Sequence, residues 1–104
     1  MSRNKVQNIV KIYAQELKKN KFPFFAIYIF GSQVNGKTDK WSDIDVAVVS
    51  DKLKRNHWQN MIKLGRVSLS VDDRIEVHGF TREEFKNNAN PMAYEIRKLG
   101  IKVV

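Results

Sequence analysis

The 104-residue sequence is long enough for one modest hydrophobic core, and we expect a single domain over residues 1–104. It has no cysteine, which excludes disulfide bonds and thiolate zinc sites, and its two histidines are too few for a zinc site made of histidines. No apolar run approaches the ~18–20 residues of a membrane span, and the N-terminus lacks the apolar core of a signal peptide, so we expect a soluble cytoplasmic protein without a membrane partner.

The charge of the sequence is strongly basic. Its 19 Lys and Arg residues against 11 Asp and Glu residues give a formal net charge of +8. This suits a polyphosphate ligand, a nucleic acid or an acidic protein, although lysines that only solvate helix surfaces would give the same total. No basic run alternates with aromatic residues as in single-strand binders, and the chain has no room for domains that grip a polymer, so direct nucleic-acid binding is disfavoured.

The first half of the chain predicts two helices and two strands. Residues 3–19 place apolar side chains at helical spacing. Residues 24–30 are an unbroken apolar and aromatic run, which is typical of a strand covered on both faces, and this run ends at Gly31. A short helix is expected over 32–36, followed by a polar loop and a second strand over 43–49.

The second half is expected to add three helices and two strands. In chain order these are a helix over 53–69, a strand over 74–79, a short helix capped by Thr81, a helix from Pro91 to Leu99 and a terminal strand over 101–104. Apolar residues that we place toward the core are Trp58, Met61, Ile62 and Leu64 in the first of these helices, and by default Met92, Tyr94, Ile96 and Leu99 in the last, where an interface is the alternative. The fold class is therefore α/β (α+β), with a small mixed β-sheet flanked by helices.

Two acidic residues stand at the start of the second strand. Asp43 and Asp45 are two positions apart, and alternate residues of a strand lie on one face, ~6.6–6.8 Å apart along the chain. Two carboxylates held side by side repel each other unless a cation lies between them or one is protonated. Such hard oxygen ligands suit Mg²⁺. In the alternative, both residues are solvated turn or cap residues, which does not explain why the strand-like sequence begins at Asp43 itself.

The Gly31-Ser32 pair closes the preceding strand. Because a short helix follows directly, the backbone amides of Ser32 and Gln33 are expected to point toward a bound anion. Taken alone, the pair is better explained as an ordinary strand-to-helix turn with a serine cap. The two aspartates downstream reverse this balance and favour a phosphate site that faces a metal site.

Together these residues form a compound motif. Gly31-Ser32, the further glycine Gly36 and the run Ser42-Asp43-Ile44-Asp45-Val46 resemble the signature of the DNA polymerase β-type nucleotidyltransferase superfamily. At this length the chain resembles the smallest members, the minimal nucleotidyltransferase (MNT) domains, and the likeness continues through 74–80 and 90–101. The resemblance implies a polymerase β-like nucleotidyltransferase fold, with residues 1–104 as one MNT domain.

The resemblance also implies a mechanism. In such enzymes three carboxylates hold two divalent ions, here Mg²⁺, while a nucleoside monophosphate, expected to be AMP from ATP, is transferred to a hydroxyl group. Asp43 and Asp45 would be two of these catalytic, metal-binding residues. Glu76 is the candidate for the third because it alternates with the core residues Ile75 and Val77, although the family more often has aspartate at this place.

Glu76 also has a plainer explanation. It could be a surface acid paired with Arg74 or His78, as exposed acids on strands often are. Asp72 and Asp73 are then the fallback acids, although they look like turn residues.

The resemblance assigns the nucleotide to the turn. Gly31 and Ser32 are expected to bind the β- and γ-phosphates. Many relatives carry an arginine between the two glycines, whereas this chain has Gln33-Val34-Asn35, so that Lys37 or Lys40 would supply a point charge instead. We expect activity to be retained but slow. The full set of expected cofactor-binding residues is Gly31, Ser32, Gln33, Lys37 and Ser42.

The family resemblance suggests a partner as well as a substrate. It implies that the acceptor is a tyrosine hydroxyl on a HEPN-type protein, with this protein as the antitoxin of a toxin–antitoxin pair. The alternative is a catalytically weak or inactive binding module that inhibits its partner stoichiometrically. Modification of a small molecule, as in aminoglycoside nucleotidyltransferases, is disfavoured because no acceptor-binding domain is present, and a homo-oligomer stays open.

Overall fold

The structure is a computed structural model and describes residues 2–35 and 43–104. Along the chain its elements are α1 (Arg3–Lys19), β1 (Ala26–Phe30), α2 (Ser32–Asn35), β2 (Ile44–Val49), the 3₁₀ turn η1 (Asp51–Lys54), α3 (His57–Val71), β3 (Ile75–Phe80), α4 (Arg82–Lys86), α5 (Pro91–Leu99) and β4 (Ile101–Lys102). Four residues named in the sequence analysis lie outside the described residues, namely Gly36, Lys37, Lys40 and Ser42.

The strands form a mixed sheet in the order β3-β2-β1-β4. β1 is antiparallel to β2 and β4, whereas β2 and β3 are parallel neighbours joined by the crossover through η1 and α3. The mixed sheet flanked by helices that the sequence predicts is therefore confirmed.

Side-chain caps explain where several helices begin. The Ser2 hydroxyl accepts a hydrogen bond from the amide of Lys5 at the start of α1. At α4 the hydroxyl of Thr81 accepts from the amide of Glu84, whose carboxylate accepts from the amide of Thr81, which completes a capping box. These caps satisfy amides that have no partner inside the helix.

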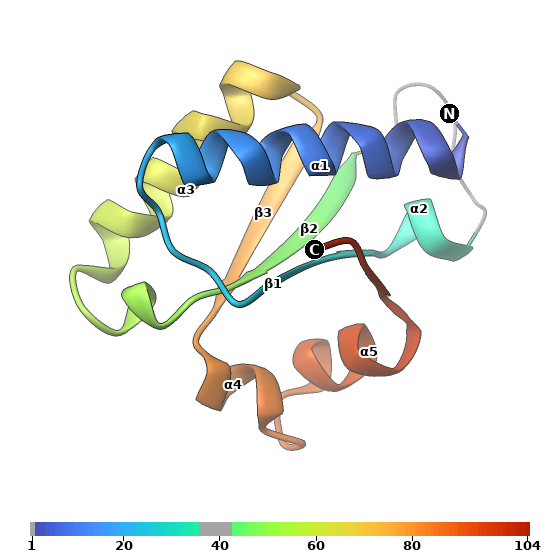
Figure 1. The fold of residues 1–104 in the computed structure, drawn as a ribbon. Helices are drawn as coiled ribbons and strands as arrows, with labels where there is room; N and C mark the ends of the chain where they lie inside the picture. The colour runs from blue at the N-terminus through green and yellow to red at the C-terminus, as the bar shows by residue number, and fades with distance from the viewer. Residues whose placement is uncertain (1, 36–42) are drawn as a thin grey trace.

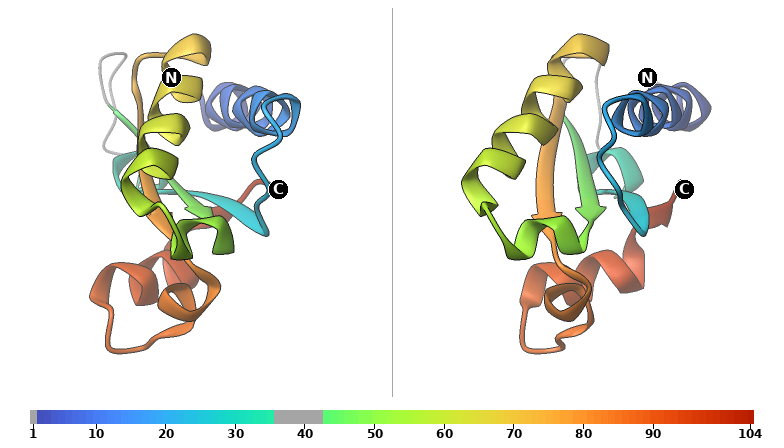
Figure 2. Two further views of the ribbon diagram at one scale, coloured as in Figure 1. Left: turned by 90° about the vertical axis from the view of Figure 1, so that its left-hand side faces the viewer. Right: turned by 60° about the vertical axis from the view of Figure 1, so that its left-hand side comes forward.

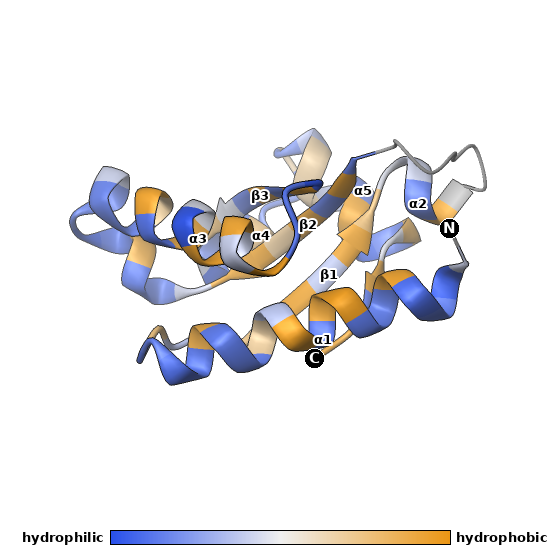
Figure 3. Cartoon of the chain, turned by 90° about the horizontal axis from the view of Figure 1, so that it is seen from above, coloured by the Kyte–Doolittle hydropathy of each residue, from blue (hydrophilic) through white to orange (hydrophobic). Residues whose placement is uncertain are grey.

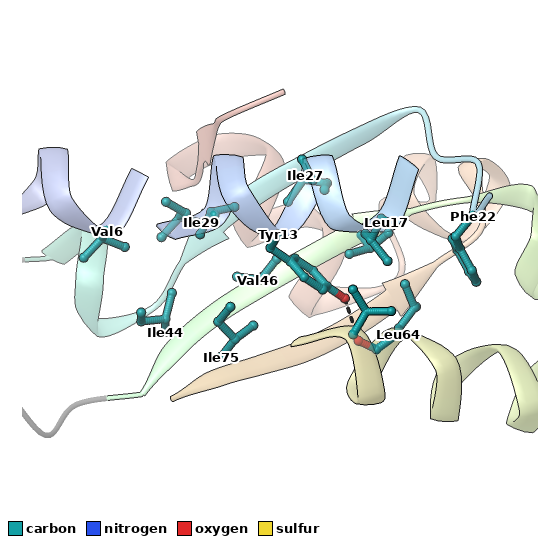
Figure 4. Packing of buried hydrophobic residues seen from close by; sticks show 14 of the residues in the cluster. Val6, Tyr13, Leu17, Phe22, Ile27, Ile29, Ile44, Val46, Leu64 and Ile75 are labelled. Carbon is teal, nitrogen blue, oxygen red and sulfur yellow. Dashed lines mark hydrogen bonds between the residues drawn. The ribbon is translucent and has the colours of Figure 1, made fainter. Parts of the chain in front are cut away.

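The two faces of the sheet are covered by different helices. Figures 1 and 2 show α1 and α3 on one side of the strands and α4 and α5 on the other. Figure 4 shows the first core, in which the hydroxyl of Tyr13 on α1 donates a 2.8 Å hydrogen bond to the carbonyl oxygen of Leu64 on α3. The second core is smaller, and its buried residues are Ala26, Ala47, Val49, Phe80, Phe85, Ala93 and Ile96.

In Figure 3 the strands are largely hydrophobic, whereas α1 and α3 alternate between hydrophobic and hydrophilic residues. This alternation is expected of helices that bury one face against a sheet. Among the described residues, no helix is both long enough and apolar enough to cross a membrane.

The expected core positions need two corrections. In α3, Leu64 is buried, but Trp58 and Ile62 are exposed because the helix packs against the sheet through the face that carries Leu64 and Val67. In α5, Ile96 is buried together with Ala93, whereas the apolar residues on its outer side are exposed, namely Met92, Tyr94 and Leu99.

Candidate active site

Strand pairing brings two acids together. Asp45 is the second residue of β2, and its backbone pairs with Glu76 on the parallel strand β3 and with Phe30 on β1. Side chains of paired residues lie on the same face of a sheet. One ligand atom each from Asp45, Glu76 and His78 lies within 4.8 Å of the other two. We call Asp45, Glu76 and His78 the acid–histidine cluster.

The cluster lies on the face of the sheet that α4 and α5 cover farther along. Ala47, Val49 and Phe80 follow Asp45 and His78 on this face and belong to the second core. The cluster itself is open to solvent, since Glu76 is exposed and the side chains of Asp45 and His78 are about one quarter exposed. The carboxylates of Asp45 and Glu76 therefore lie at the edge of the second core, next to solvent.

Gly31 lies directly against the Asp45 carboxylate. Its φ of +76° is in the left-handed region that favours glycine, and a Cβ atom at this position would lie 2.5 Å from Asp45 Oδ2. A carbon atom at that distance would force the Asp45 carboxylate to move, so the backbone conformation and this close approach both favour glycine at position 31. The sequence predicts a phosphate-binding role for Gly31 but gives no sign of this contact with Asp45.

Ser32 and Gln33 begin the short helix α2. Because they occupy its first positions, their backbone amides have no acceptor within the helix. The side chain of Gln33 is buried, and its Nε2 donates a hydrogen bond of 3.2 Å to the backbone oxygen of Asp43. The Gln33 side chain therefore links α2 to the segment that enters β2.

Asp43 is placed differently from Asp45. It precedes β2, which begins at Ile44, and its side chain is exposed. Among the described residues, the group of potential ligand atoms within 4.8 Å does not include Asp43. The sequence suggests that Asp43 and Asp45 lie side by side, but Asp43 is not part of the cluster. The acid that lies beside Asp45 in the cluster is Glu76.

His78 is a member of the cluster that sequence reasoning did not assign to the site. Its Nε2 lies 3.5 Å from Asp45 Oδ1 and 3.9 Å from Glu76 Oε1, and this nitrogen is buried without a hydrogen-bond partner among the described residues. Its ring packs edge-on against Phe30, with ring centroids 5.1 Å apart. The sequence feature that could have pointed to His78 is its spacing from Glu76, since residues two apart on a strand lie on the same face.

The fallback acid Asp72 has a different role. Arg74 Nη2 lies 2.7 Å from Asp72 Oδ2, and Arg74 also donates from its backbone amide and Nε to Asp72 Oδ1. These bonds, above all those from the side chain, lower the pKa of Asp72. Asp72 and Arg74 therefore form an ion pair at the turn that leads into β3.

The cluster has the composition of a divalent-cation site. Two carboxylates and one imidazole nitrogen converge, and the buried nitrogen has no hydrogen-bond partner among the described residues, so it is available to a cation that the two carboxylates share. Oxygen ligands suit Mg²⁺, while an imidazole suits transition-metal ions. The residues present therefore fit a bound divalent cation.

The chain is similar to known nucleotidyltransferases. The model of the family described as "Polymerase beta, Nucleotidyltransferase" matches residues 7–104. Over 44 residues, 41% are identical to the "Probable protein adenylyltransferase MntA" of Haemophilus influenzae; the match covers 42% of this chain and 35% of that relative, so it spans little more than a third of the relative's length.

A solved structure has a similar fold. It is that of a candidate nucleotidyltransferase from Sulfolobus solfataricus, with a TM-score of 0.64 over 96% of this chain and 78% of the other. Since only 19% of the aligned residues are identical, this likeness concerns the fold alone.

Proposed function

Because the chain belongs to the polymerase beta family of nucleotidyltransferases, we propose that it transfers a nucleoside monophosphate from a nucleoside triphosphate to a hydroxyl group. The hydroxyl oxygen would bond to the α-phosphorus while the bond between the α- and β-phosphates breaks, and pyrophosphate would leave. We propose ATP as the donor and Mg²⁺ as the ion that accompanies its phosphates. The observation that carries this proposal is that Asp45 pairs with Glu76 across β2 and β3, while the carboxylate of Asp45 lies directly against Gly31.

Each acid has a distinct role in the proposal. Asp45 is held by neighbouring strands on both sides and by its contact with Gly31, so its carboxylate is the fixed ligand of the site. Glu76 and Asp43 are exposed and would complete the set of three carboxylates. Bound divalent ions would neutralise the triphosphate and lower the pKa of the attacking hydroxyl. The Glu76 carboxylate is exposed and is our candidate for taking up the proton of the acceptor hydroxyl.

The Gly31 turn is proposed to bind the phosphates. The first amides of α2, at Ser32 and Gln33, are those that helical geometry leaves without an acceptor, and the Ser32 hydroxyl adds a further donor. The acids across the turn would hold the cations that balance the phosphate charge. Most of the acceleration would come from positioning and charge neutralisation.

We further propose that the acceptor is a hydroxyl group of a protein, specifically a tyrosine of a HEPN-type partner. Support for a protein acceptor comes from the name of the Haemophilus relative, a protein adenylyltransferase. Mass spectrometry of a co-expressed partner tests this directly. Mass increments of one AMP on the partner support catalysis on a protein, whereas a tight complex with an unmodified partner contradicts it.

One observation favours the second candidate, a binding module with weak catalysis. Asp43 is exposed and lies apart from the acid–histidine cluster, so the described residues bring together two carboxylates and not three. A module of this kind would inhibit its partner in proportion to the amount of complex, with or without ATP. Inhibition that requires ATP and Mg²⁺ would exclude it.

The catalytic proposal is tested by Asp45→Asn. This change keeps the shape of the side chain and removes its charge, and we expect ATP turnover to fall at least ~100-fold because a ligand of the triphosphate-bound cation is lost. The matched control is Asp73→Asn, the same substitution in an exposed turn acid near β3. Equal turnover in wild type and Asp45→Asn would refute the site, and a loss in Asp73→Asn alone would move it to the turn.

A further inference from the structure

We propose that His78 is a ligand of one of the divalent ions and gives this site a preference for a first-row transition-metal ion over Mg²⁺. The inference builds on the proposed function, because it concerns the cation that serves the same carboxylates. It adds a nitrogen donor to a site for which the sequence suggested oxygen ligands only.

The sheet places His78 beside the two acids. His78 follows Glu76 by two residues on β3, and its backbone pairs with Ala47, which follows Asp45 by two residues on β2. The imidazole ring lies with its Nε2 toward the carboxylates of Asp45 and Glu76. The edge-on contact with Phe30 supports the ring from the side of β1.

The distances fit a shared ion better than hydrogen bonds. Hydrogen bonds between nitrogen and oxygen are typically ~2.7–3.2 Å long, whereas His78 Nε2 lies 3.5 Å from Asp45 Oδ1 and 3.9 Å from Glu76 Oε1. Two ligand atoms that each lie ~2.0–2.2 Å from one ion are ~2.8–4.4 Å apart, depending on the angle between them. Both distances fall within that range. The His78 Nε2 atom is also buried without a hydrogen-bond partner among the described residues, as expected for a nitrogen that binds a metal ion.

The donor set then determines the choice of ion. Mg²⁺ binds carboxylates, waters and phosphates, and it has little affinity for imidazole nitrogen. Co²⁺ and Zn²⁺ bind imidazole and carboxylate together, and their affinity for mixed nitrogen and oxygen sites exceeds that of Mn²⁺. A site of two carboxylates and one imidazole is therefore expected to bind Co²⁺ more tightly than Mg²⁺, and this preference should become much smaller when the imidazole is removed.

The test compares the binding of Co²⁺ and of Mg²⁺ by isothermal titration calorimetry, using the full chain without nucleotide. We expect His78→Gln to lower Co²⁺ affinity ~10–100-fold and to change Mg²⁺ affinity by less than ~3-fold. His57→Gln is the matched control, because His57 is the second histidine and is exposed at the start of α3. Unchanged Co²⁺ affinity in His78→Gln, or an equal loss of affinity for both ions, would overturn the proposal.

A second measurement uses only the wild-type protein, so its result does not depend on whether a variant folds. In the wild-type protein, nitrogen NMR of the two imidazoles during titration with Zn²⁺ should show a large shift at Nε2 of His78, completed at stoichiometric metal, with His57 as the internal reference. A ring that serves only as packing against Phe30, or as a hydrogen-bond donor to Asp45, would show no such metal-bound signal. Absence of that signal would overturn the proposal.

The outcomes separate this inference from the proposed function. Metal bound through His78 in a protein that does not turn over ATP supports the inference and contradicts the proposed function. Turnover of ATP that depends on Asp45, in a protein without a metal-bound imidazole, contradicts the inference and leaves the proposed function in place.

Discussion

Replacing Gly31 by alanine should damage the site more than the fold. The backbone at Gly31 has a φ of +76°, and an L-residue held in the left-handed region costs ~1–2 kcal/mol. For a domain of this size, each kcal/mol lowers Tm by ~4–8 °C. We therefore expect Gly31→Ala to remain folded, with a Tm lowered by an amount that circular dichroism measures easily.

The effect on Asp45 is a separate consequence. The new methyl carbon would lie 2.5 Å from Asp45 Oδ2, and a carbon at this position needs at least 3.0 Å, so the carboxylate must move by half an ångström or more. Displacements of this size in a catalytic group, up to ~1 Å, can cost ~100-fold in rate. We expect Gly31→Ala to lower both metal affinity and ATP turnover ~10–100-fold, well beyond what its loss of stability explains.

Gly65→Ala is the matched control for this experiment. A Cβ atom at Gly65 meets nothing within 4 Å, and the residue lies inside α3, where alanine is favoured over glycine by ~0.5–1 kcal/mol. The control should raise Tm slightly and leave metal binding unchanged. If Gly31→Ala keeps wild-type metal affinity while its Tm falls, the contact between Gly31 and Asp45 does not position the carboxylate. If its Tm does not fall, the cost assigned to the left-handed backbone is wrong.

Three further substitutions test contacts of the fold outside the acid–histidine cluster, each by urea unfolding. Tyr13→Phe removes the hydrogen bond to the Leu64 carbonyl and should lower the free energy of unfolding by ~0.5–1.5 kcal/mol at neutral pH. Because burial raises the pKa of Tyr13, the free energy of unfolding of the wild type should fall as the pH rises above ~10, and that of the variant should fall less. Asp72→Asn removes the ion pair with Arg74, which lowers the pKa of Asp72 in the folded state, so its cost should be present above pH ~4 and should shrink as the pH falls below that value. Thr81→Ala removes half of the capping box of α4 and should cost ~1 kcal/mol at any pH between 6 and 9. A wild-type unfolding curve in any of the three variants would contradict the corresponding contact.

The site shows what strand alternation in a sequence can and cannot predict. On the predicted strand over 74–79, Glu76 alternates with the core residues Ile75 and Val77, and this made it the candidate for the third acid that the resemblance implies. The parallel register that places Glu76 opposite Asp45 is a property of two strands, and no local pattern of either strand contains it. Without the register, nothing distinguished His78 from a surface histidine.

The exposed residues of α3 show a similar limit. This helix carries two apolar stripes, one through Met61, Leu64 and Val67 and another through Trp58, Ile62 and Leu69. Helical spacing predicts that each stripe shares a face, but it does not say which stripe packs on the sheet. The choice depends on how η1 and the turn at Asn56, with its left-handed backbone, direct the helix across the strands.

The place where the second core ends explains why the site can bind a cation at all. If α4 and α5 covered the sheet as far as Asp45 and Glu76, both carboxylates would lose most of their hydration, and neighbouring buried carboxylates of like charge would take up a proton instead of binding metal. If the pair were fully exposed, water would screen the attraction to a cation. The side chain of Asp45 is 24% exposed and that of Glu76 57% exposed, so one ligand is fixed and partly desolvated while the other remains open to solvent and substrate. Ala47 is fully buried next to His78 at this boundary. Ala47→Leu overpacks the edge of the second core and should displace His78, so we expect weaker metal binding in the folded variant although no ligand is removed. Unchanged affinity in that variant would contradict this account of the boundary.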